Sequence, residues 1–95
     1  MKPRKTRDIE NNLKRKGFRA INRNHIFYVL YVNGKKTSIR TKISHGSKEY
    51  PGSLLIQMAK QLHLKRDEFN NLIDCPLTQE ELIEILIKRG VLITT

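Results

Sequence analysis

The clearest hydrophobic pattern in the chain lies between residues 25 and 43. Residues 25–32 are rich in β-branched and aromatic side chains, and residues 35–43 form a second run. Asn33-Gly34 stands between the two runs, and an Asn-Gly pair favours a two-residue hairpin turn because both of its residues take positive φ. The pattern therefore predicts a hairpin in which Val32 faces Lys35 across the turn.

Helical and strand patterns flank this hairpin. Five further elements are expected: a helix over residues 6–16, a strand over residues 18–22, and helices from Ser53, over residues 65–73, and from Thr78 to about Arg89. Thr6, Ser53 and Thr78 are the expected N-caps, because a hydroxyl there accepts a hydrogen bond from the first helical turn. The order predicts an α+β fold, α-β-β-β-α, with a three-stranded antiparallel sheet, helices on one face and two C-terminal helices. Residues 1–95 are expected to form a single domain.

Alternate residues of the hairpin separate into a core face and an outer face. The core face carries Ile26, Tyr28, Leu30 and Val32. The outer face carries four predicted pairs: His25 opposite Lys42, Phe27 opposite Arg40, Val29 opposite Ser38, and Tyr31 opposite Lys36. The register thus predicts a basic and aromatic outer face with one histidine on it.

Positive charge is concentrated in the N-terminal half of the chain. The sequence holds 19 Lys and Arg against 9 Asp and Glu, a formal net charge of +10. Residues 1–50 contain fourteen of the basic and three of the acidic residues, a net of +11, whereas residues 51–95 carry a net of −1. Charge confined to one region is typical of polyanion binding, although a basic protein can also carry it only as a solvated surface.

Several other classes of protein are disfavoured. The longest apolar run, residues 26–32, is far shorter than the roughly twenty residues of a membrane span. The single Cys75 cannot form an internal disulfide and no apolar signal segment follows the basic start, so we expect a cytoplasmic protein without a membrane partner. One Cys and three scattered His give no zinc spacing, and the glycines form no phosphate loop, so neither metal nor cofactor is expected.

Four short motifs stand at the boundaries of the expected elements: Gly17-Phe18 after the first helix, Asn24-His25 at the second strand, Ser44-His45 after the third strand, and Pro51-Gly52-Ser53-Leu54 at the next helix. Together they give residues 5–64 a resemblance to the HicA toxin family of small RNA-cleaving proteins. It implies a fold like the double-stranded-RNA-binding domain, messenger RNA cleavage by a histidine at the position of His25, and an antitoxin protein as partner. The chain departs from the family at Asn22-Arg23, where Gly-Ser is usual, and residues 65–95 form an extension without a counterpart.

An imidazole beside several cations suits metal-independent RNA cleavage. The 2′-hydroxyl of RNA can attack the adjacent phosphate once a base takes its proton, and histidine, with an unperturbed pKa of about 6.5, can be that base. His25 is therefore the candidate catalytic residue, and the alternative is an ordinary surface histidine. The expected RNA contacts are Arg23, Phe27, Tyr31, Lys36, Arg40, Lys42 and His45. The cations would bind phosphates, the rings would stack on bases, and His45 is a candidate second proton donor.

Two other functions fit the same sequence. A non-catalytic module of this fold would bind RNA by its shape, through phosphate and 2′-hydroxyl contacts, and cut nothing. Alternatively, the C-terminal helices over residues 65–95 are the working surface of a protein-interaction domain. Their apolar side chains could extend the core, form a homodimer contact, or cover the outer face of the sheet.

Overall fold

The computed structural model describes residues 2–44, 46–74 and 76–92. Its elements are β1 (Arg4–Lys5), α1 (Thr6–Arg15), β2 (Phe18–Asn22), β3 (Ile26–Val32), β4 (Lys35–Ile43), β5 (Glu49–Tyr50), α2 (Gly52–Gln61), α3 (Arg66–Ile73) and α4 (Gln79–Lys88). The predicted α+β class, the α-β-β-β-α order and the two C-terminal helices are therefore confirmed.

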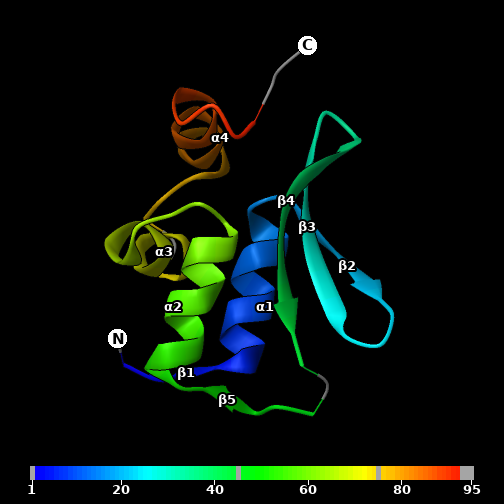
Figure 1. The fold of residues 1–95 in the computed structure, drawn as a ribbon, viewed down its shortest axis with the longest axis vertical. Coiled ribbons are helices and arrows are strands. Elements are labelled where there is room, and N and C mark those ends of the chain that lie inside the picture. The colour runs from blue at the N-terminus through cyan, green and yellow to red at the C-terminus, as the bar shows by residue number, and fades with distance from the viewer. Residues whose placement is uncertain (1, 45, 75, 93–95) are drawn as a thin grey trace.

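The helices cover one face of the central sheet. Strands β2, β3 and β4 pair antiparallel in that order. Helices α1 and α2 lie against one face of this sheet, and α3 and α4 lie on the same side of the molecule (Figure 1). In the part of the chain that the structure describes, no helix covers the opposite face, which we call the outer face.

The turn between β3 and β4 forms as its Asn-Gly pair predicts. Asn33, with φ 53°, and Gly34, with φ 77°, both lie in the left-handed region. Next to the turn, Tyr31 pairs with Lys36 as expected. The hairpin therefore starts in the predicted register.

A β-bulge then shifts the pairing by two residues. Phe27 faces Lys42 rather than the predicted Arg40, and Val29 faces Arg40 rather than the predicted Ser38. Because side chains alternate between faces with a period of two, a shift of two keeps every residue on its predicted face. The outer face therefore keeps its predicted composition, and only the neighbours within it change.

The Thr37 side chain provides a local reason for the bulge. Its hydroxyl donates to the carbonyl oxygen of Leu30 at 2.7 Å, and it accepts from the backbone N–H of Ile39 at 3.2 Å. A hydroxyl that bonds to nearby backbone groups competes with the regular ladder of the sheet. This competition allows β4 to carry extra residues opposite Leu30.

Two of the expected N-caps are wrong. Lys5 stands at the N-cap of α1 and Pro51 at the N-cap of α2, and neither helix has a side-chain cap. Thr6 and Ser53 consequently lie inside the first turn of their helices. The extended backbone of Pro51, with φ −70° and ψ 162°, starts α2 earlier than the hydroxyl at residue 53 predicts.

The apolar core joins the sheet to both C-terminal helices. The largest completely covered side chains of α3 and α4 are Phe69, Leu72, Leu82 and Leu86, each with no exposed surface. Ile87, 39% exposed, is a large apolar side chain of α4 that faces solvent. Most apolar residues of the extension therefore extend the core of this chain, and the homodimer contact stays a prediction.

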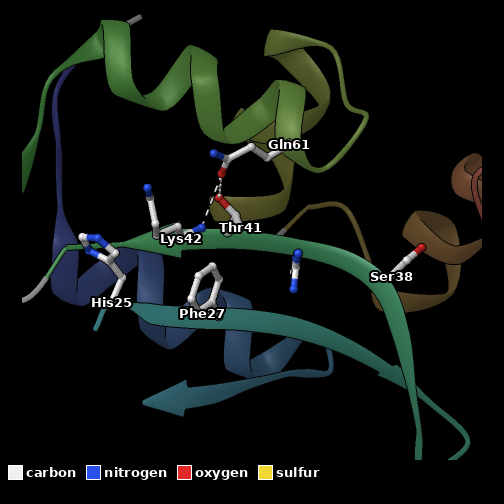
Figure 2. A pocket seen from close by; sticks show the side chains of 7 residues that line it. His25, Phe27, Ser38, Thr41, Lys42 and Gln61 are labelled. Carbon is white, nitrogen blue, oxygen red and sulfur yellow. Dashed lines mark hydrogen bonds between the residues drawn. The ribbon is translucent and has the colours of Figure 1, made fainter. Parts of the chain in front are cut away.

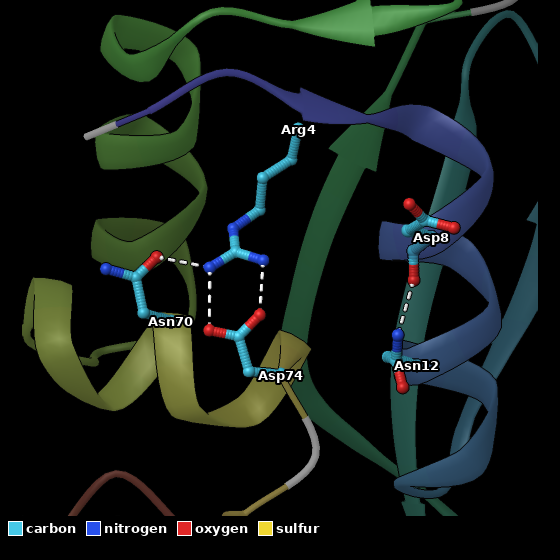
Figure 3. Close-up of polar contacts among 5 residues, drawn as sticks. All are labelled: Arg4, Asp8, Asn12, Asn70 and Asp74. Carbon is cyan, nitrogen blue, oxygen red and sulfur yellow. Dashed lines mark hydrogen bonds and ion pairs between the residues drawn. The ribbon is translucent and has the colours of Figure 1, made fainter.

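Polar contacts hold the N-terminal segment to the extension. Arg4 Nη2 donates to Asp74 Oδ2 at 2.9 Å and to Asn70 Oδ1 at 3.0 Å (Figure 3). This segment forms strand β1, which pairs with β5 in a two-stranded sheet that is too short to show an alternating pattern in the sequence. At the other end of α1, the Lys16 ammonium donates to the carbonyl oxygen of Leu77.

Polar groups at the ends of α3 and α4 are also paired. Thr78 caps α4 as predicted, since the Glu81 N–H donates to its Oγ1 at 3.1 Å and its own N–H donates to Glu81 Oε1 at 3.0 Å. Arg89 Nη2 donates to Glu68 Oε2 at 2.6 Å, and Arg89 Nη1 donates to the His63 carbonyl oxygen at 2.8 Å. The extension thus uses much of its charge within the fold.

Candidate nucleic-acid interface

His25 lies in the turn that connects β2 to β3. Residues 23–25 form this turn, and the backbone N–H of Arg23 donates to the His25 carbonyl oxygen at 3.0 Å. The predicted pairing of His25 with Lys42 is wrong, because β3 begins one residue after the histidine and the bulge places Phe27 opposite Lys42. His25 is nevertheless exposed.

The imidazole and the cations of β4 line one hollow of about 390 Å³. Its lining residues are His25, Phe27, Ser38, Arg40, Thr41, Lys42 and Gln61 (Figure 2). Four of them, His25, Phe27, Arg40 and Lys42, are predicted site residues. The structure therefore brings the candidate base, one ring and two cations together at the edge of the sheet.

Gln61 reaches this hollow from the end of α2. Thr41 Oγ1 donates to Gln61 Oε1 at 2.6 Å, and the backbone N–H of Lys42 donates to the same oxygen at 3.3 Å. Both contacts are drawn in Figure 2. Because Oε1 accepts from two donors, the amide is oriented, and Nε2 is left as a hydrogen-bond donor at the rim of the hollow.

The hollow is cationic. Its described lining residues include Arg40 and Lys42 but no Asp or Glu. The Arg40 guanidinium lies 5.6 Å from the centroid of the Phe27 ring, within the range of a cation–π contact. Among the described residues, neither cation forms an ion pair with a carboxylate. Their charge therefore favours an anionic ligand.

The remaining predicted contacts lie apart from the hollow. Lys36 faces Tyr31 near the β3–β4 turn, and the guanidinium of Arg19 lies 4.3 Å from the centroid of the Tyr31 ring. Arg23 is exposed in the β2–β3 turn. His45 lies outside the residues that the structure describes. The described members of the predicted set are thus divided: four line the hollow, Arg23 lies in the turn that also holds His25, and Tyr31 and Lys36 lie at the far end of the hairpin.

Two residues of this face were missed by the sequence analysis. A glutamine near the end of a helix gives no pattern that distinguishes it, so Gln61 could be found only from the packing of α2 on β4. Arg19 did carry a signal. It follows the apolar Phe18 on a predicted strand, and alternation alone places it on the outer face.

A second hollow lies at the N-terminus of α1. Its lining residues are Lys5, Thr6, Arg7, Glu10, Ser47, Lys48 and Glu49. Three cations and two carboxylates share this surface, so their charges partly cancel. The hydroxyl of Thr6 is buried and has no hydrogen-bond partner, but it is also out of reach of solvent. We therefore place the candidate site at the first hollow.

The part of the chain that the structure describes contains neither a cluster of metal-ligating side chains nor a helix able to span a membrane. No three or more His, Cys, Asp or Glu side chains gather as a potential metal site in residues 2–44, 46–74 and 76–92. Across the same residues, none of the helices has the length and hydrophobicity needed to traverse a bilayer.

Comparisons with known proteins give no match. No family model, no curated protein and no solved structure matches this chain. The resemblance to HicA toxins therefore stays a prediction that rests on the quoted motifs. The geometry of the hollow is therefore the main structural indication of function.

Proposed function

We propose that this protein binds RNA on its outer face and cleaves it without a metal ion, with His25 as the general base. The observation that carries the proposal is the single hollow that joins an exposed imidazole to two cations and an oriented amide donor. RNA offers the matching groups. Its phosphate is anionic, and its 2′-hydroxyl carries a proton that a base can remove.

The proposed reaction is an internal transfer of the phosphoryl group. The His25 imidazole takes the proton of the 2′-hydroxyl while the 2′ oxygen bonds to the adjacent phosphorus. The bond from phosphorus to the 5′ oxygen breaks, and that leaving oxygen takes a proton from water. The products are a 2′,3′-cyclic phosphate and a 5′-hydroxyl, and His25 returns to its neutral form by losing its proton to solvent.

The neighbours of His25 stabilise the negative charge of this reaction. The phosphate carries more negative charge in the transition state than before it, and fixed donors aimed at that charge lower the barrier. Arg40 and Lys42 supply positive charge, and Gln61 Nε2 supplies a neutral hydrogen bond. The Thr41 hydroxyl acts through Gln61, as a positioning residue, because its hydrogen bond helps to orient the amide.

The resemblance to HicA toxins agrees with this proposal. It suggests messenger RNA as the substrate and an antitoxin as the natural inhibitor, and the cytoplasm, expected from the sequence, stays the proposed compartment. We propose that such a partner would present acidic side chains to the outer face, since the described lining of its hollow includes Arg40 and Lys42 but no Asp or Glu.

A second candidate is RNA binding without cleavage. His25 is the only histidine among the described residues that line the hollow, so these residues include no second imidazole to protonate the leaving oxygen. A binding module of this kind needs the cations and the donors, but it does not need His25 as a base.

Cleavage by a matched pair of variants tests the proposal. His25→Asn and the control His63→Asn each replace an exposed imidazole by an amide, and asparagine tolerates the left-handed φ of 61° at residue 63. A structured RNA is incubated with each protein in EDTA between pH 5 and 9, and product length and end groups are determined. We expect His25→Asn to lose about 10²- to 10⁴-fold in rate with unchanged RNA affinity, and the control to match the unsubstituted protein.

Two outcomes contradict His25 as the catalytic base. One is binding of RNA by the unsubstituted protein with no cleavage at any pH, which would favour the binding module. The other is equal cleavage by His25→Asn and the unsubstituted protein. Products that end in a 3′-hydroxyl would also exclude the internal transfer, since that chemistry leaves the phosphate on the 3′ side.

A further inference from the structure

The outer face continues beyond the hollow as a row of arginine–aromatic pairs. Arg40 on β4 lies over Phe27, and Arg19 on β2 lies over Tyr31. Both rings belong to β3 and point to the same face, four residues apart. At a strand rise of about 3.3 Å per residue, their positions are separated by about 13 Å. The second pair therefore lies well outside the hollow.

Val29 shows that this row is packed. It stands between the two rings on β3, with Arg19 as its partner on β2 and Arg40 as its partner on β4. It is only 1% exposed, yet it does not belong to the apolar core on the other face. The arginine stems and rings around it must therefore exclude water, which orders the two guanidinium groups on the surface.

In both pairs the arginine is more exposed than the aromatic ring beside it. Phe27 and Tyr31 are half-buried, whereas Arg19 and Arg40 are exposed. No described carboxylate forms an ion pair with either arginine. Unpaired bases stack on arginine planes as well as on aromatic rings, and a guanidinium can also donate to phosphate or to a base edge. Each pair is therefore suited to one unstacked nucleotide.

Single-stranded RNA and duplex RNA can offer different groups to these arginine–aromatic pairs. In a duplex the bases stack on one another and their faces are inaccessible, so a duplex can offer only its phosphates, 2′-hydroxyls and base edges to these planes. A single strand can offer a base face at each pair. We infer that the outer face is a platform for single-stranded RNA, with Arg19 and Tyr31 as a second base site along β3 from the cleavage hollow. The inference rests on the proposed function and specifies its substrate.

Substitutions at residue 19 separate stacking from charge. Arg19→Lys keeps the positive charge and removes the planar group, while Arg19→Gln removes both. Arg66→Gln is the matched control, because Arg66 is an exposed arginine at the start of α3, away from the sheet. All variants are made in the His25→Asn background so that the RNA stays intact. Thermal unfolding checks that each variant is folded.

Binding is measured by fluorescence anisotropy with an unstructured single-stranded RNA and with the duplex of the same strand. We expect the single strand to bind at least about tenfold more tightly than the duplex. Arg19→Lys is expected to lower single-strand affinity by at least about fivefold, the loss of one base stack, and to leave duplex affinity unchanged. Arg66→Gln is expected to change single-strand affinity by less than about twofold.

The outcomes distinguish this inference from the function on which it rests. Tighter duplex binding, or a folded Arg19→Lys variant that binds the single strand normally, would overturn the platform. Cleavage that depends on His25 would still support the proposed function in that case. Failure to bind either form of RNA would overturn both.

Discussion

The outer face of the sheet and the two C-terminal helices use their charged residues in different ways. On the outer face, Arg19 and Arg40 lie over aromatic rings, and neither has a carboxylate partner among the described residues. In the extension, carboxylates are paired with arginines of the same chain: Arg4 with Asp74, and Arg89 with Glu68. Net charge alone therefore does not identify a binding face. The informative charges are the cations that gather with an imidazole and aromatic rings and have no described carboxylate partner.

The same comparison assigns different roles to the two regions. The extension contributes buried leucines and internal ion pairs, so we expect substitutions there to change stability first. The outer face contributes exposed cations around a hollow, so we expect substitutions there to change RNA binding first. Three experiments test this division.

The largest effect is expected from the core of α4. Leu86 has no exposed surface, and its truncation to alanine removes packed atoms and leaves a cavity. We expect Leu86→Ala to lower the free energy of unfolding by about 2–5 kcal/mol in urea denaturation. Ile87→Ala is the matched control. The Ile87 side chain follows Leu86 in the sequence and is 39% exposed, so its loss should lower the free energy of unfolding much less.

The RNA affinity of the folded Leu86→Ala protein shows whether α4 affects only stability or also the RNA site. At a temperature where Leu86→Ala is still folded, its affinity for single-stranded RNA should equal that of the unsubstituted protein within about twofold. A folded Leu86→Ala protein that has lost RNA affinity would show that α4 also shapes the RNA site. The division between the two regions would then be incorrect.

The second experiment removes the cations of the hollow. Log affinity falls as log salt rises. If Arg40 and Lys42 each contact one phosphate, the double substitution Arg40→Gln, Lys42→Gln should make this negative slope shallower by about 1.4. At about 0.1 M salt the affinity for single-stranded RNA should fall about 25-fold. Titrations between about 0.05 and 0.2 M salt measure both quantities.

A control in the extension removes the same charge. Arg66→Gln, Lys88→Gln also replaces one exposed arginine and one exposed lysine, but at α3 and α4. Its salt slope should remain that of the unsubstituted protein. An equal loss of slope in both double variants would mean that net charge, rather than a particular face, governs RNA binding.

The sequence predicts the composition of the outer face, because side chains along a strand alternate between the two faces of the sheet. Asn33-Gly34 predicts the turn, and the period of two places Phe27 and Arg40 on one face. The predicted faces are correct although the pairing beyond the bulge differs, because the bulge shifts the register there by two residues, whereas Tyr31 and Lys36 pair as predicted. Thr37 could not be recognised as its cause, since any threonine in a strand can make this local hydrogen bond or leave it unmade.

Other features depend on contacts between distant residues and have no local signal. Gln61 acts at the hollow only because α2 ends beside β4, and the sequence predicts the helix without its position on the sheet. The Arg4–Asp74 pair joins residues 70 positions apart. Alternation does predict the outer-face position of Arg19, but not that its guanidinium lies over Tyr31.

The smallest effect is expected from the ion pairs of the extension, and it depends on pH. The hydrogen bond from Arg4 lowers the pKa of Asp74 below its usual 3.8, and that from Arg89 lowers the pKa of Glu68 below its usual 4.5. A carboxyl group whose pKa is lower in the folded state adds stability above its usual pKa, and this stability is lost as the pH falls through the lowered value. Both pairs are partly exposed, so each should contribute only about 0.5 kcal/mol.

Urea denaturation of Asp74→Asn at several pH values measures this contribution. At pH 7 the variant should be about 0.5 kcal/mol less stable than the unsubstituted protein, and the difference should disappear once the pH lies below the lowered pKa of Asp74. Glu84→Gln, a substitution of an exposed carboxylate on α4, should show little difference at any pH. A difference for Asp74→Asn that persists undiminished into strong acid would show that the residue stabilises the fold through something other than its charge. The ion pair with Arg4 would then no longer distinguish the extension from the outer face.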